Sequence, residues 1–195
     1  PLRAMLAAMA REHLRDALAL VALLAGACRP GDSTTGPGRP GASAGPLSGS
    51  VADELVAAHN EVRAAVGEPP DYRGTWEPLP PVRWSGEVAA SAQAWADHLR
   101  DRSGCALLHD GRSPHGENLA AGRGLSPSGA VRLWASEKDR HTFEPARSLV
   151  AAHYTQIVWR DSVEIGCGMA RCADGVRVLC CRYSPPGNVL GRHPY

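Results

Sequence analysis

A predicted β-hairpin near the end of the chain places the strongest constraint on its fold. Two apolar, valine- and cysteine-containing runs, residues 163–172 and 176–183, are joined by the sequence Ala-Asp-Gly at 173–175. Short apolar runs separated by a glycine-containing turn are typical of two antiparallel strands. Because side chains alternate between the two faces of a strand, such a hairpin determines which of its cysteines can meet.

The cysteines indicate an exported domain that disulfides stabilise. Five of the six lie in the second half of the chain, namely Cys105, Cys167, Cys172, Cys180 and Cys181. Bridged cysteines need α-carbons about 5.5 Å apart. The hairpin therefore predicts the disulfide Cys167–Cys181, disfavours Cys172–Cys181, and leaves Cys105 as the best partner of Cys172. Cys180 points to the opposite face from Cys181 and is left over, either as a buried free thiol or in an intermolecular disulfide.

Residues 1–28 have the pattern of an export signal rather than of a folded segment. Positive charges precede an apolar stretch at 17–25, which is too short for a membrane span and suits the core of a signal peptide. The sequence Ala-Gly-Ala-Cys resembles a bacterial lipobox, in which Cys28 would be lipid-modified; the alternative is plain secretion with cleavage near Ala27. Residues 29–49 are rich in Gly, Pro and Ser and predict a flexible tether. We expect an exported protein, secreted or held at the cell envelope, that contacts the membrane only through this anchor.

The folded domain is expected to span residues 50–195. Amphipathic helical periods with capping residues alternate irregularly with short apolar runs in this region. The expected helices lie at 50–67, 85–104 and 126–140, and the expected strands at 105–109, 117–120, 163–172 and 176–183. Residues 153–159 fit a short helix and a strand equally well. This irregular order predicts an α+β layered domain.

The composition argues against several classes of protein. The chain has 21 Lys and Arg against 20 Asp and Glu, so no excess of basic charge favours nucleic acid as a partner. The sequence motifs of P-loop and dinucleotide-binding proteins, serine hydrolases and zinc proteases are absent. Lys138 is the only lysine, and the dominance of arginine, with abundant Ala, Gly and Pro, is typical of a GC-rich bacterial genome.

Polar residues embedded in apolar segments are the remaining candidates for a functional site. They are His59, His109, Glu117, Glu137 and His153. Asn60 follows His59 on the first helix, and Arg63 lies one turn further on. Polar sets of this kind on a helix are usually structural, so we expect these three residues to tie the helix to neighbouring loops.

Four short stretches carry a resemblance to a known family. They are HNEVR at 59–63, HGENLA at 115–120, HYTQIVW at 153–159 and VLCCRYSPPGNV at 178–189. In this order they are similar to the signatures of the CAP superfamily, which comprises cysteine-rich secretory proteins, antigen 5 and pathogenesis-related class 1 proteins. The resemblance covers residues 51–195 and is closest to the plant pathogenesis-related type. It implies a three-layer α-β-α sandwich, the CAP or SCP fold, with a small central antiparallel sheet and a short helix that begins near His153.

The resemblance also implies a cleft that contains two histidines and two glutamates. The matching positions are His109, Glu117, Glu137 and His153. Two neutral imidazoles can bind a divalent metal such as Zn²⁺, while nearby carboxylates orient the rings or hold metal-bound water. With only His109 and His153 as protein ligands, such a zinc site would be weak and exchangeable. The alternative is a hydrogen-bonded polar cluster that needs no metal.

Two functions are compatible with these features. The first, which the resemblance favours, is an exported, non-enzymatic module that binds a lipid, a sterol-like ligand or an extracellular protein. The second is a metal-dependent hydrolase in which a metal-bound water is the nucleophile and Glu117 or Glu137 is the base. We expect the first, because two histidines are few ligands for a catalytic metal and no serine or free cysteine is placed as an alternative nucleophile.

Overall fold

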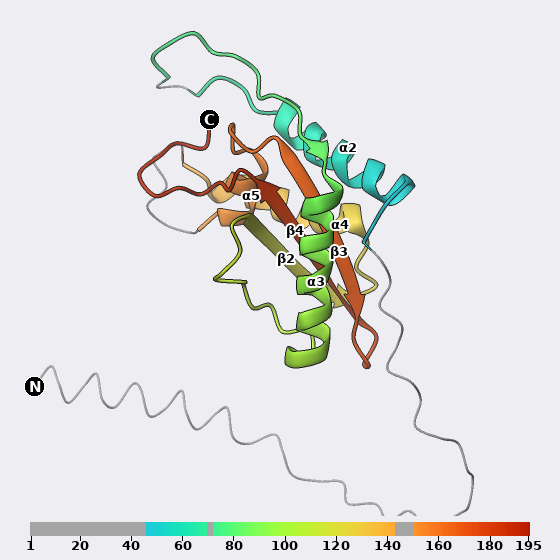
Figure 1. Ribbon diagram of the computed structural model, residues 1–195. Coiled ribbons are helices and arrows are strands. Elements are labelled where there is room, and N and C mark those ends of the chain that lie inside the picture. Colours follow the sequence, from blue (N-terminus) through green and yellow to red (C-terminus); the bar gives the residue numbers. More distant parts are fainter. Residues whose placement is uncertain (1–45, 70–71, 143–149) are drawn as a thin grey trace, which may run out of the picture. The chain divides into compact units, whose positions relative to one another are not determined.

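The computed structural model describes residues 46–69, 72–142 and 150–195 (Figure 1). In chain order its elements are α2 (Ser50–Ala64), β1 (Arg83–Trp84), α3 (Gly86–Ser103), β2 (Gly116–Arg123), α4 (Pro127–Ala135), the 3-10 helix η1 (Ser136–Arg140), α5 (Ala152–Ile157), β3 (Glu164–Arg171) and β4 (Val176–Ser184). The predicted signal peptide with Cys28, and the tether up to residue 45, lie outside the described residues. Within those ranges no helix has both the length and the apolar character that crossing a membrane requires.

A four-stranded sheet forms the middle layer, with the strand order β1-β3-β4-β2. The pairs β3–β4 and β2–β4 are antiparallel, whereas β1 runs parallel to β3. The predicted antiparallel sheet is therefore confirmed for three strands and wrong for the edge strand β1. A strand of two residues has no recognisable period in the sequence, and its partner lies far along the chain.

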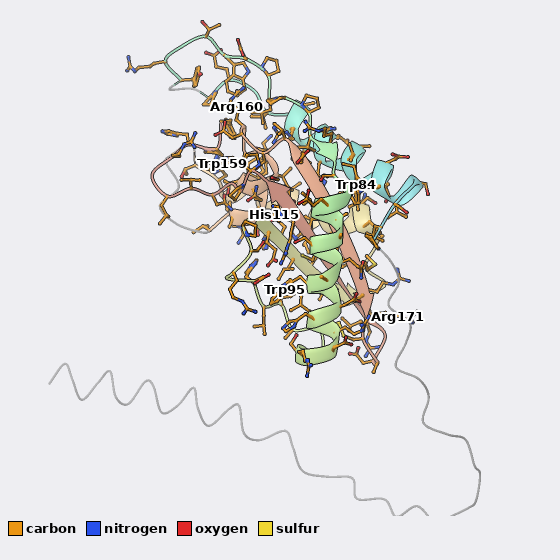
Figure 2. The ribbon with its side chains drawn as sticks, viewed as in Figure 1. Trp84, Trp95, His115, Trp159, Arg160 and Arg171 are labelled. Atoms are coloured by element: carbon orange, nitrogen blue, oxygen red, sulfur yellow. A yellow bond between two sulfur atoms is a disulfide. The ribbon has the colours of Figure 1, made fainter. Side chains whose placement is uncertain are left out.

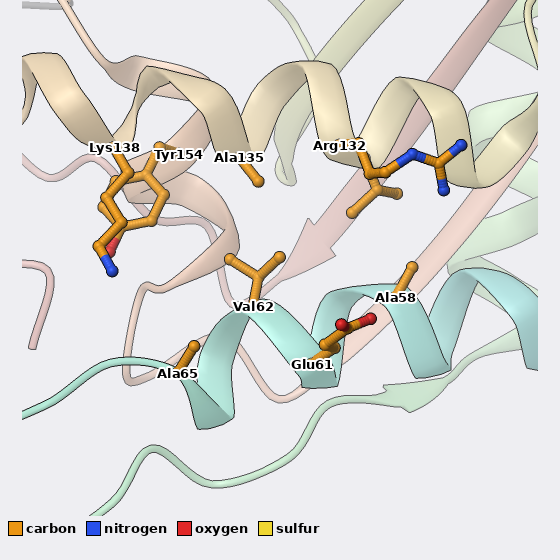
Figure 3. Close-up of a pocket in the computed structure, with 9 residues that line it drawn as sticks. Ala58, Glu61, Val62, Ala65, Arg132, Ala135, Lys138 and Tyr154 are labelled. Atoms are coloured by element: carbon orange, nitrogen blue, oxygen red, sulfur yellow. The ribbon is translucent and has the colours of Figure 1, made fainter.

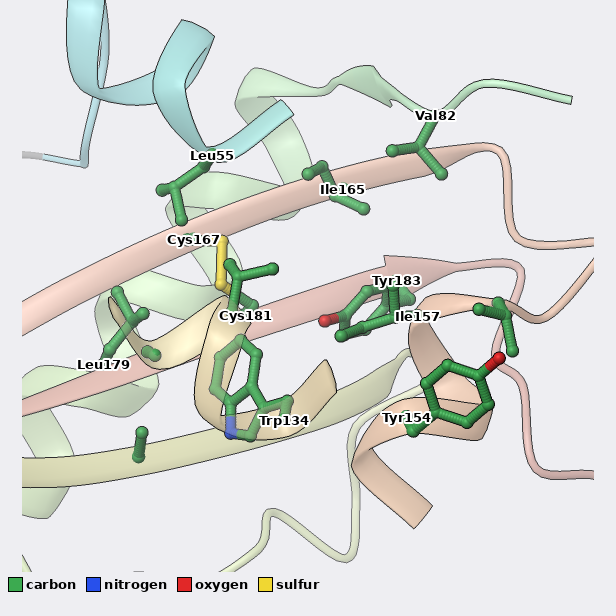
Figure 4. Close-up of a cluster of buried hydrophobic side chains, with 14 of the residues drawn as sticks. Leu55, Val82, Trp134, Tyr154, Ile157, Ile165, Cys167, Leu179, Cys181 and Tyr183 are labelled. Atoms are coloured by element: carbon green, nitrogen blue, oxygen red, sulfur yellow. A yellow bond between two sulfur atoms is a disulfide. The ribbon is translucent and has the colours of Figure 1, made fainter. Parts of the chain in front are cut away.

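Helices cover both faces of the sheet and produce the predicted α-β-α sandwich. The long helix α3 crosses one face (Figure 1), where Ala96 and Leu99 belong to the buried cluster on that side. The helices α2, α4 and α5 cover the other face. There Leu55, Trp134 and Ile157 pack together over the sheet (Figure 4).

Two glycines allow α3 to approach β3 closely. A Cβ atom on Gly166 would lie 2.0 Å from the backbone nitrogen of Ala89, and one on Gly168 would lie 2.2 Å from the Cα atom of Gln93. No larger side chain fits at such a contact between two backbones. The Gln93 amide then forms two hydrogen bonds with the backbone of Met169, at 3.0 and 3.1 Å.

The ends of the helices follow the sequence closely. The side chains of Ser85 and Ser126, the first residues of two expected helices, accept hydrogen bonds from the first turns of α3 and α4. The helix α2 ends at Ala64 rather than at Gly67. The ambiguous stretch 153–159 contributes most of α5, which confirms the helix that the resemblance implied.

Residues 105–109, predicted as a strand, form an irregular loop instead. Gly104 ends α3 in the left-handed region, and Cys105 also has a positive φ of 64°. Two successive residues of this kind turn the chain sharply and interrupt an extended conformation. Leu107 and Leu108 are 49% and 56% exposed. The apolar run that suggested a strand therefore does not contribute these two side chains to a core.

Both predicted disulfides are present. Cys167 and Cys181 are register partners in the hairpin with α-carbons 4.1 Å apart, and Cys105 and Cys172 are bonded with α-carbons 6.2 Å apart. Cys180 is free, fully buried and part of the cluster under α3. A thiol without exposed surface cannot reach a second chain, so in the folded domain Cys180 is the buried free thiol of the two alternatives.

Candidate functional site

A chain of buried hydrogen bonds runs from α2 through the sheet to α5. The His59 imidazole contacts the Leu55 carbonyl through Nδ1 at 2.7 Å and the Tyr183 hydroxyl through Nε2 at 2.9 Å. Because a carbonyl only accepts, Nδ1 carries the proton and Nε2 accepts from Tyr183. Asn118 in β2 donates to the Tyr183 hydroxyl and to the His153 carbonyl, each at 3.0 Å. Burial lowers the pKa of His59 to about 4, so this imidazole is neutral at pH 7.

Arg63 fixes the far end of α5. Its guanidinium donates to the carbonyls of Ile157 and of Trp159, which is labelled in Figure 2, each at 2.8 Å. Its Nε donates to a carbonyl in the loop before β1. Burial lowers the pKa of Arg63 to about 10, and the carbonyls at the helix end stabilise its charge. Asn60 makes two hydrogen bonds with the same loop. Asn60 and Arg63 thus tie α2 to loops as expected, whereas His59 reaches the sheet instead.

His153 and Glu137 form the first pair of the predicted tetrad. Glu137 Oε1 lies 2.9 Å from His153 Nδ1, while Oε2 accepts from the backbone nitrogens of His153 at 3.0 Å and Tyr154 at 3.4 Å. Arg140 lies 3.3 Å from Oε1. The His153 ring stacks on Trp134 with centroids 6.2 Å apart. These contacts fix the orientation of the imidazole at the start of α5 and leave its Nε2 without a partner among the described residues.

His109 and Glu117 form the second pair. Glu117 Oε1 lies 2.8 Å from His109 Nδ1 and accepts from the backbone nitrogen of Asp110 at 3.2 Å. The Glu117 side chain is only 6% exposed, whereas that of His109 is 60% exposed. The hydrogen bond to Glu117 raises the pKa of His109. The pair therefore presents an exposed imidazole that a buried carboxylate holds in place.

A buried arginine supports this second pair from beneath. Arg182 lies opposite Glu117 in the β2–β4 register, and its Nη2 is 3.2 Å from Glu117 Oε2 and 2.8 Å from Asp110 Oδ2. Its guanidinium lies 6.0 Å from the Trp95 ring, and Trp95 is labelled on α3 in Figure 2. The Cys180 thiol is 3.8 Å from Glu117 Oε2, and burial raises the pKa of this thiol. Arg182 neutralises one of two carboxylates that would otherwise repel each other at close range.

The tetrad is thus arranged as two histidine–carboxylate pairs. In both pairs the carboxylate accepts from Nδ1, so Nε2 is the atom left for a metal or another ligand. Asn118, next to Glu117 in β2, connects the pairs because it donates to the His153 carbonyl. Across residues 46–69, 72–142 and 150–195, no group of three or more His, Cys, Asp or Glu side chains could hold a metal ion. The two pairs offer two imidazoles rather than a complete ligand set.

Arg182 and Asp110 were not predicted as part of the site. The sequence does contain a signal for Arg182, because alternation along β4 places it on the same face as the buried Cys180. A buried arginine needs hydrogen-bond acceptors, and nearby carboxylates can supply them and also compensate its charge. The antiparallel pairing of β4 with β2 would then have identified Glu117 as one of them.

A second candidate site is a groove between α2 and the α4–η1 segment (Figure 3), with a volume of about 310 Å³. The residues that line it are Ala58, Glu61 and Val62 on α2, Ala65 directly after it, Val131, Arg132, Ala135 and Lys138 opposite, and Tyr154 of α5. Three of these are alanines, whose short side chains leave the space between the helices unfilled. In Figure 3, Lys138 and Tyr154 lie at one end of the groove and Arg132 at the other. The groove therefore has small, mostly apolar walls that also carry the Glu61 carboxylate, with a cation at each end.

Comparison with known proteins identifies the family. Residues 56–183 match CAP, the cysteine-rich secretory protein family. The chain belongs to the CAP family. It is 40% identical over 144 residues to pathogenesis-related protein 1 of Arabidopsis thaliana, and the aligned residues cover 73% of this chain and 81% of that protein. It is 41% identical over 148 residues to a pathogenesis-related protein of the PR-1 type from Sambucus nigra, which covers 73% and 80% of the two chains.

Solved structures agree with this assignment at the level of the fold. The crystal structure of NaASP2 with Zn²⁺ superposes with a TM-score of 0.61 at 22% identity, covering 75% of this chain and 86% of that one. The resemblance to the plant pathogenesis-related type and the CAP fold are therefore confirmed. Membership of a secretory family, together with two disulfides, makes this a CAP-domain protein of the extracellular type. Lipid modification at Cys28 and a bacterial origin stay predictions.

Proposed function

We propose that this CAP domain is an exported, non-enzymatic binding module whose ligand is a lipid or another amphiphile with a linear or sterol-like apolar part. The observation that carries the proposal is the groove between α2 and α4–η1. Its volume of about 310 Å³ falls in the range of small-molecule sites. An apolar chain would lie along the alanines, and the polar part of the ligand would meet a cation at one end.

The proposal predicts how affinity depends on the length of the apolar chain. Each methylene that leaves water contributes about 0.8 kcal/mol, or about fourfold in Kd. Dodecanoate should therefore bind up to about 15-fold more tightly than decanoate if both added methylenes enter the groove. Isothermal titration calorimetry on the full chain measures this series, and equal affinities for the two acids would argue against an apolar groove as the binding site.

A matched pair of variants locates the binding site. Ala58→Trp places a large ring in the groove, and we expect it to weaken dodecanoate binding by at least about tenfold. Ala57→Trp is the control, because Ala57 is an exposed neighbour on α2 that does not line the groove. If the two variants bind alike, the ligand lies elsewhere, and an extracellular protein partner becomes the better hypothesis.

We also propose that His109 and His153 can hold a divalent metal such as Zn²⁺. The residues fit this role in one respect, because Glu117 and Glu137 hold each Nδ1 and leave each Nε2 as a donor. A bound metal would act as a Lewis acid there. Two protein ligands are fewer than the three or four of ordinary zinc sites, so binding would be weak and completed by water.

The hydrolase alternative has less support from the geometry. A general base must be within reach of the proton that it removes. Both oxygens of Glu117 and both oxygens of Glu137 already accept hydrogen bonds or contact a cation. Each carboxylate is therefore engaged in positioning a histidine and a neighbouring backbone or guanidinium group, which suits a structural role better than a catalytic one.

Zinc calorimetry on the full chain, together with a hydrolysis assay, distinguishes a weak metal site from a metal-dependent hydrolase. We expect one weak site in the wild type that is lost in His109→Ala/His153→Ala and kept in the surface control His98→Ala. Hydrolysis of a peptide substrate with added zinc would instead support the alternative, provided that Glu117→Gln/Glu137→Gln abolishes it. Neither double variant should change dodecanoate binding, because none of the four residues lines the groove.

A further inference from the structure

A cavity of about 340 Å³ lies where residues 192–195 meet the turn between α5 and β3. Its walls include the rings of Tyr72 and Tyr195 and the charged side chains of Arg160, Asp161 and Arg192. Of the described residues that line it, none belongs to the groove between α2 and α4–η1 or to the two histidine–carboxylate pairs. Its volume falls in the range of small-molecule sites, so this cavity is a separate candidate site.

Aromatic rings give the cavity a firm wall. The Trp76 ring packs edge-on against Tyr72 and Tyr195, with centroid distances of 5.5 and 6.0 Å. The Arg160 guanidinium lies over the same indole, 5.3 Å from its centroid, and Arg160 is labelled in Figure 2. Edge-to-face ring pairs and cation–π contacts of this kind favour fixed orientations of the rings. Tyr72 and Tyr195 therefore offer apolar surface that is already in place for a ring-shaped ligand.

Positive charge exceeds negative charge among the side chains that line the cavity. The Arg160 guanidinium donates to the backbone carbonyl of Glu77 at 2.7 Å and makes no ion pair with any described residue. Arg192 pairs with Asp161 at 2.9 Å, and these two side chains are 59% and 49% exposed. Of the described lining residues, Asp161 alone is acidic. The Arg160 charge is therefore left without a counter-ion in this part of the structure.

A buried guanidinium lies beneath Arg160. Arg63 Nη2 is 3.4 Å from the Arg160 carbonyl oxygen, and its hydrogen-bond acceptors among the described residues are all backbone carbonyls. Burial lowers the pKa of Arg63 to about 10, and repulsion by the Arg160 charge contributes to this shift. Two guanidiniums that repel each other create a positive potential at the cavity. An anion bound there would lower that repulsion.

We infer that this cavity binds an acidic sugar, that is, a sugar ring that carries a carboxylate. The carboxylate would pair with Arg160 and Arg192, since planar guanidinium groups match the two oxygens of a carboxylate. The C–H face of the sugar ring would lie against Tyr72 and Tyr195, and its hydroxyls would meet Asp161. The inference goes beyond the proposed function, because it concerns a different ligand at a different cavity.

The aromatic and the charged parts of the wall together select this class of ligand. A sugar ring has apolar C–H faces and a polar edge of hydroxyls, which suits a cavity lined by tyrosines and by charged side chains. An apolar chain would leave Arg160 without an anionic partner and would cover the Arg192–Asp161 ion pair. A bare anion would neutralise the charge and make no use of the aromatic wall. An acidic sugar uses both features.

Three probes separate the parts of the ligand. Glucuronate and glucose share a sugar ring and differ at one carbon, which is a carboxylate in the first and a hydroxymethyl group in the second. Acetate supplies the carboxylate without the ring. In calorimetry or NMR titration of the full chain, we expect glucuronate to bind at least about tenfold more tightly than glucose or acetate.

Two arginine variants locate the site. Arg160→Met should weaken glucuronate binding about tenfold and leave glucose binding unchanged, because it removes a charge-assisted hydrogen bond. Arg192→Met should weaken glucuronate binding about threefold to tenfold, and it loses only an exposed ion pair, which contributes little to stability. Arg171→Met is the matched control, because Arg171 is an exposed arginine at the end of β3 that does not line the cavity (Figure 2).

Asp161→Asn tests the charge with the opposite sign. The substitution keeps a hydrogen-bond acceptor for sugar hydroxyls and removes the carboxylate that competes for Arg192. We expect it to tighten glucuronate binding about threefold and to leave glucose binding unchanged. A substitution that only loosened the local structure would weaken the binding of both probes, so a gain for glucuronate is specific to the inferred charge pairing.

Each result supports or overturns the inference. Equal affinities for glucuronate and glucose would overturn the role of the arginines, and equal affinities for glucuronate and acetate would overturn the sugar as the ligand class. Losses in Arg171→Met as large as those in Arg160→Met would show nonspecific attraction and overturn the site. Absence of glucuronate binding to the wild type would overturn the inference and leave the proposed function intact, because dodecanoate and Ala58→Trp test that function separately.

Discussion

Acidification should destabilise the domain through His59. The folded state holds this imidazole neutral with a pKa lowered by burial to about 4, whereas the unfolded chain has an ordinary pKa of 6.5. Between these values the unfolded state binds a proton that the folded state excludes. The contribution is therefore complete above pH 6.5 and is lost as the pH falls towards 4.

The magnitude follows from the two pKa values of His59. Integration from pH 7 to pH 5 gives a loss of about 2 kcal/mol in the free energy of unfolding. Urea denaturation of the full chain at the two pH values measures it. We expect His59→Gln, which cannot titrate, to reduce this pH dependence by about 2 kcal/mol. The exposed His98 provides the control, since His98→Gln should keep the wild-type dependence.

Two other histidines also contribute to the pH dependence of stability. The difference between wild type and His59→Gln is therefore more informative than the wild-type dependence alone. Burial lowers the pKa of His141, which adds a contribution of the same sign. The hydrogen bond to Glu117 raises the pKa of His109, which contributes stability that is lost as the pH rises. Equal losses for wild type and His59→Gln would refute the reasoning. An NMR titration of His59 in the wild type gives a second test, and a midpoint near 6.5 would refute it even if the variant did not fold.

Three further substitutions test the packing by urea denaturation. Gly168→Ala should lower the free energy of unfolding by about 2 to 4 kcal/mol, because its Cβ would overlap the α3 backbone. Gly86→Ala, which has open space around it, should be neutral or stabilising. Equal effects of the two substitutions would contradict the close approach of α3 to β3. Tyr183→Phe should cost about 2 kcal/mol, since it leaves the buried His59 acceptor without a donor, and a loss below about 0.5 kcal/mol would speak against that hydrogen bond. Replacing Cys105 and Cys172 by alanine should lower the free energy of unfolding by about 4 kcal/mol, because their disulfide spans 67 residues. An unchanged stability would show that this disulfide does not stabilise the domain.

Local features of the fold could be predicted because neighbouring residues determine them. Ser85 and Ser126 mark helix starts through hydrogen bonds within one turn. In the hairpin, the short turn sets the register, and the alternation of side chains then selects Cys181 as the partner of Cys167. The prediction of a strand at 105–109 was wrong because its apolar run was read without the turn that Gly104 and Cys105 impose.

The candidate sites could be predicted only in part. The resemblance identified His109, Glu117, Glu137 and His153, but their arrangement as two pairs appears only in the structure. The burial of Arg182 next to Glu117 could not be predicted with certainty from periodicity, because an arginine in a strand is usually exposed.

The sequence by itself determined the helix starts at Ser85 and Ser126, the β-hairpin, both disulfides and the family, since each depends on short-range geometry or on contiguous motifs. Only the tertiary structure decided where charge is buried and where space is left. Ala58 and Ala135 lie on different helices, and neither indicates a groove until α2 and α4 pack side by side. His141 likewise becomes an unsatisfied buried group only when Tyr154 and Tyr195 close around it. Cavities and buried charges are properties of surfaces that meet in space, and a linear pattern does not specify which surfaces meet.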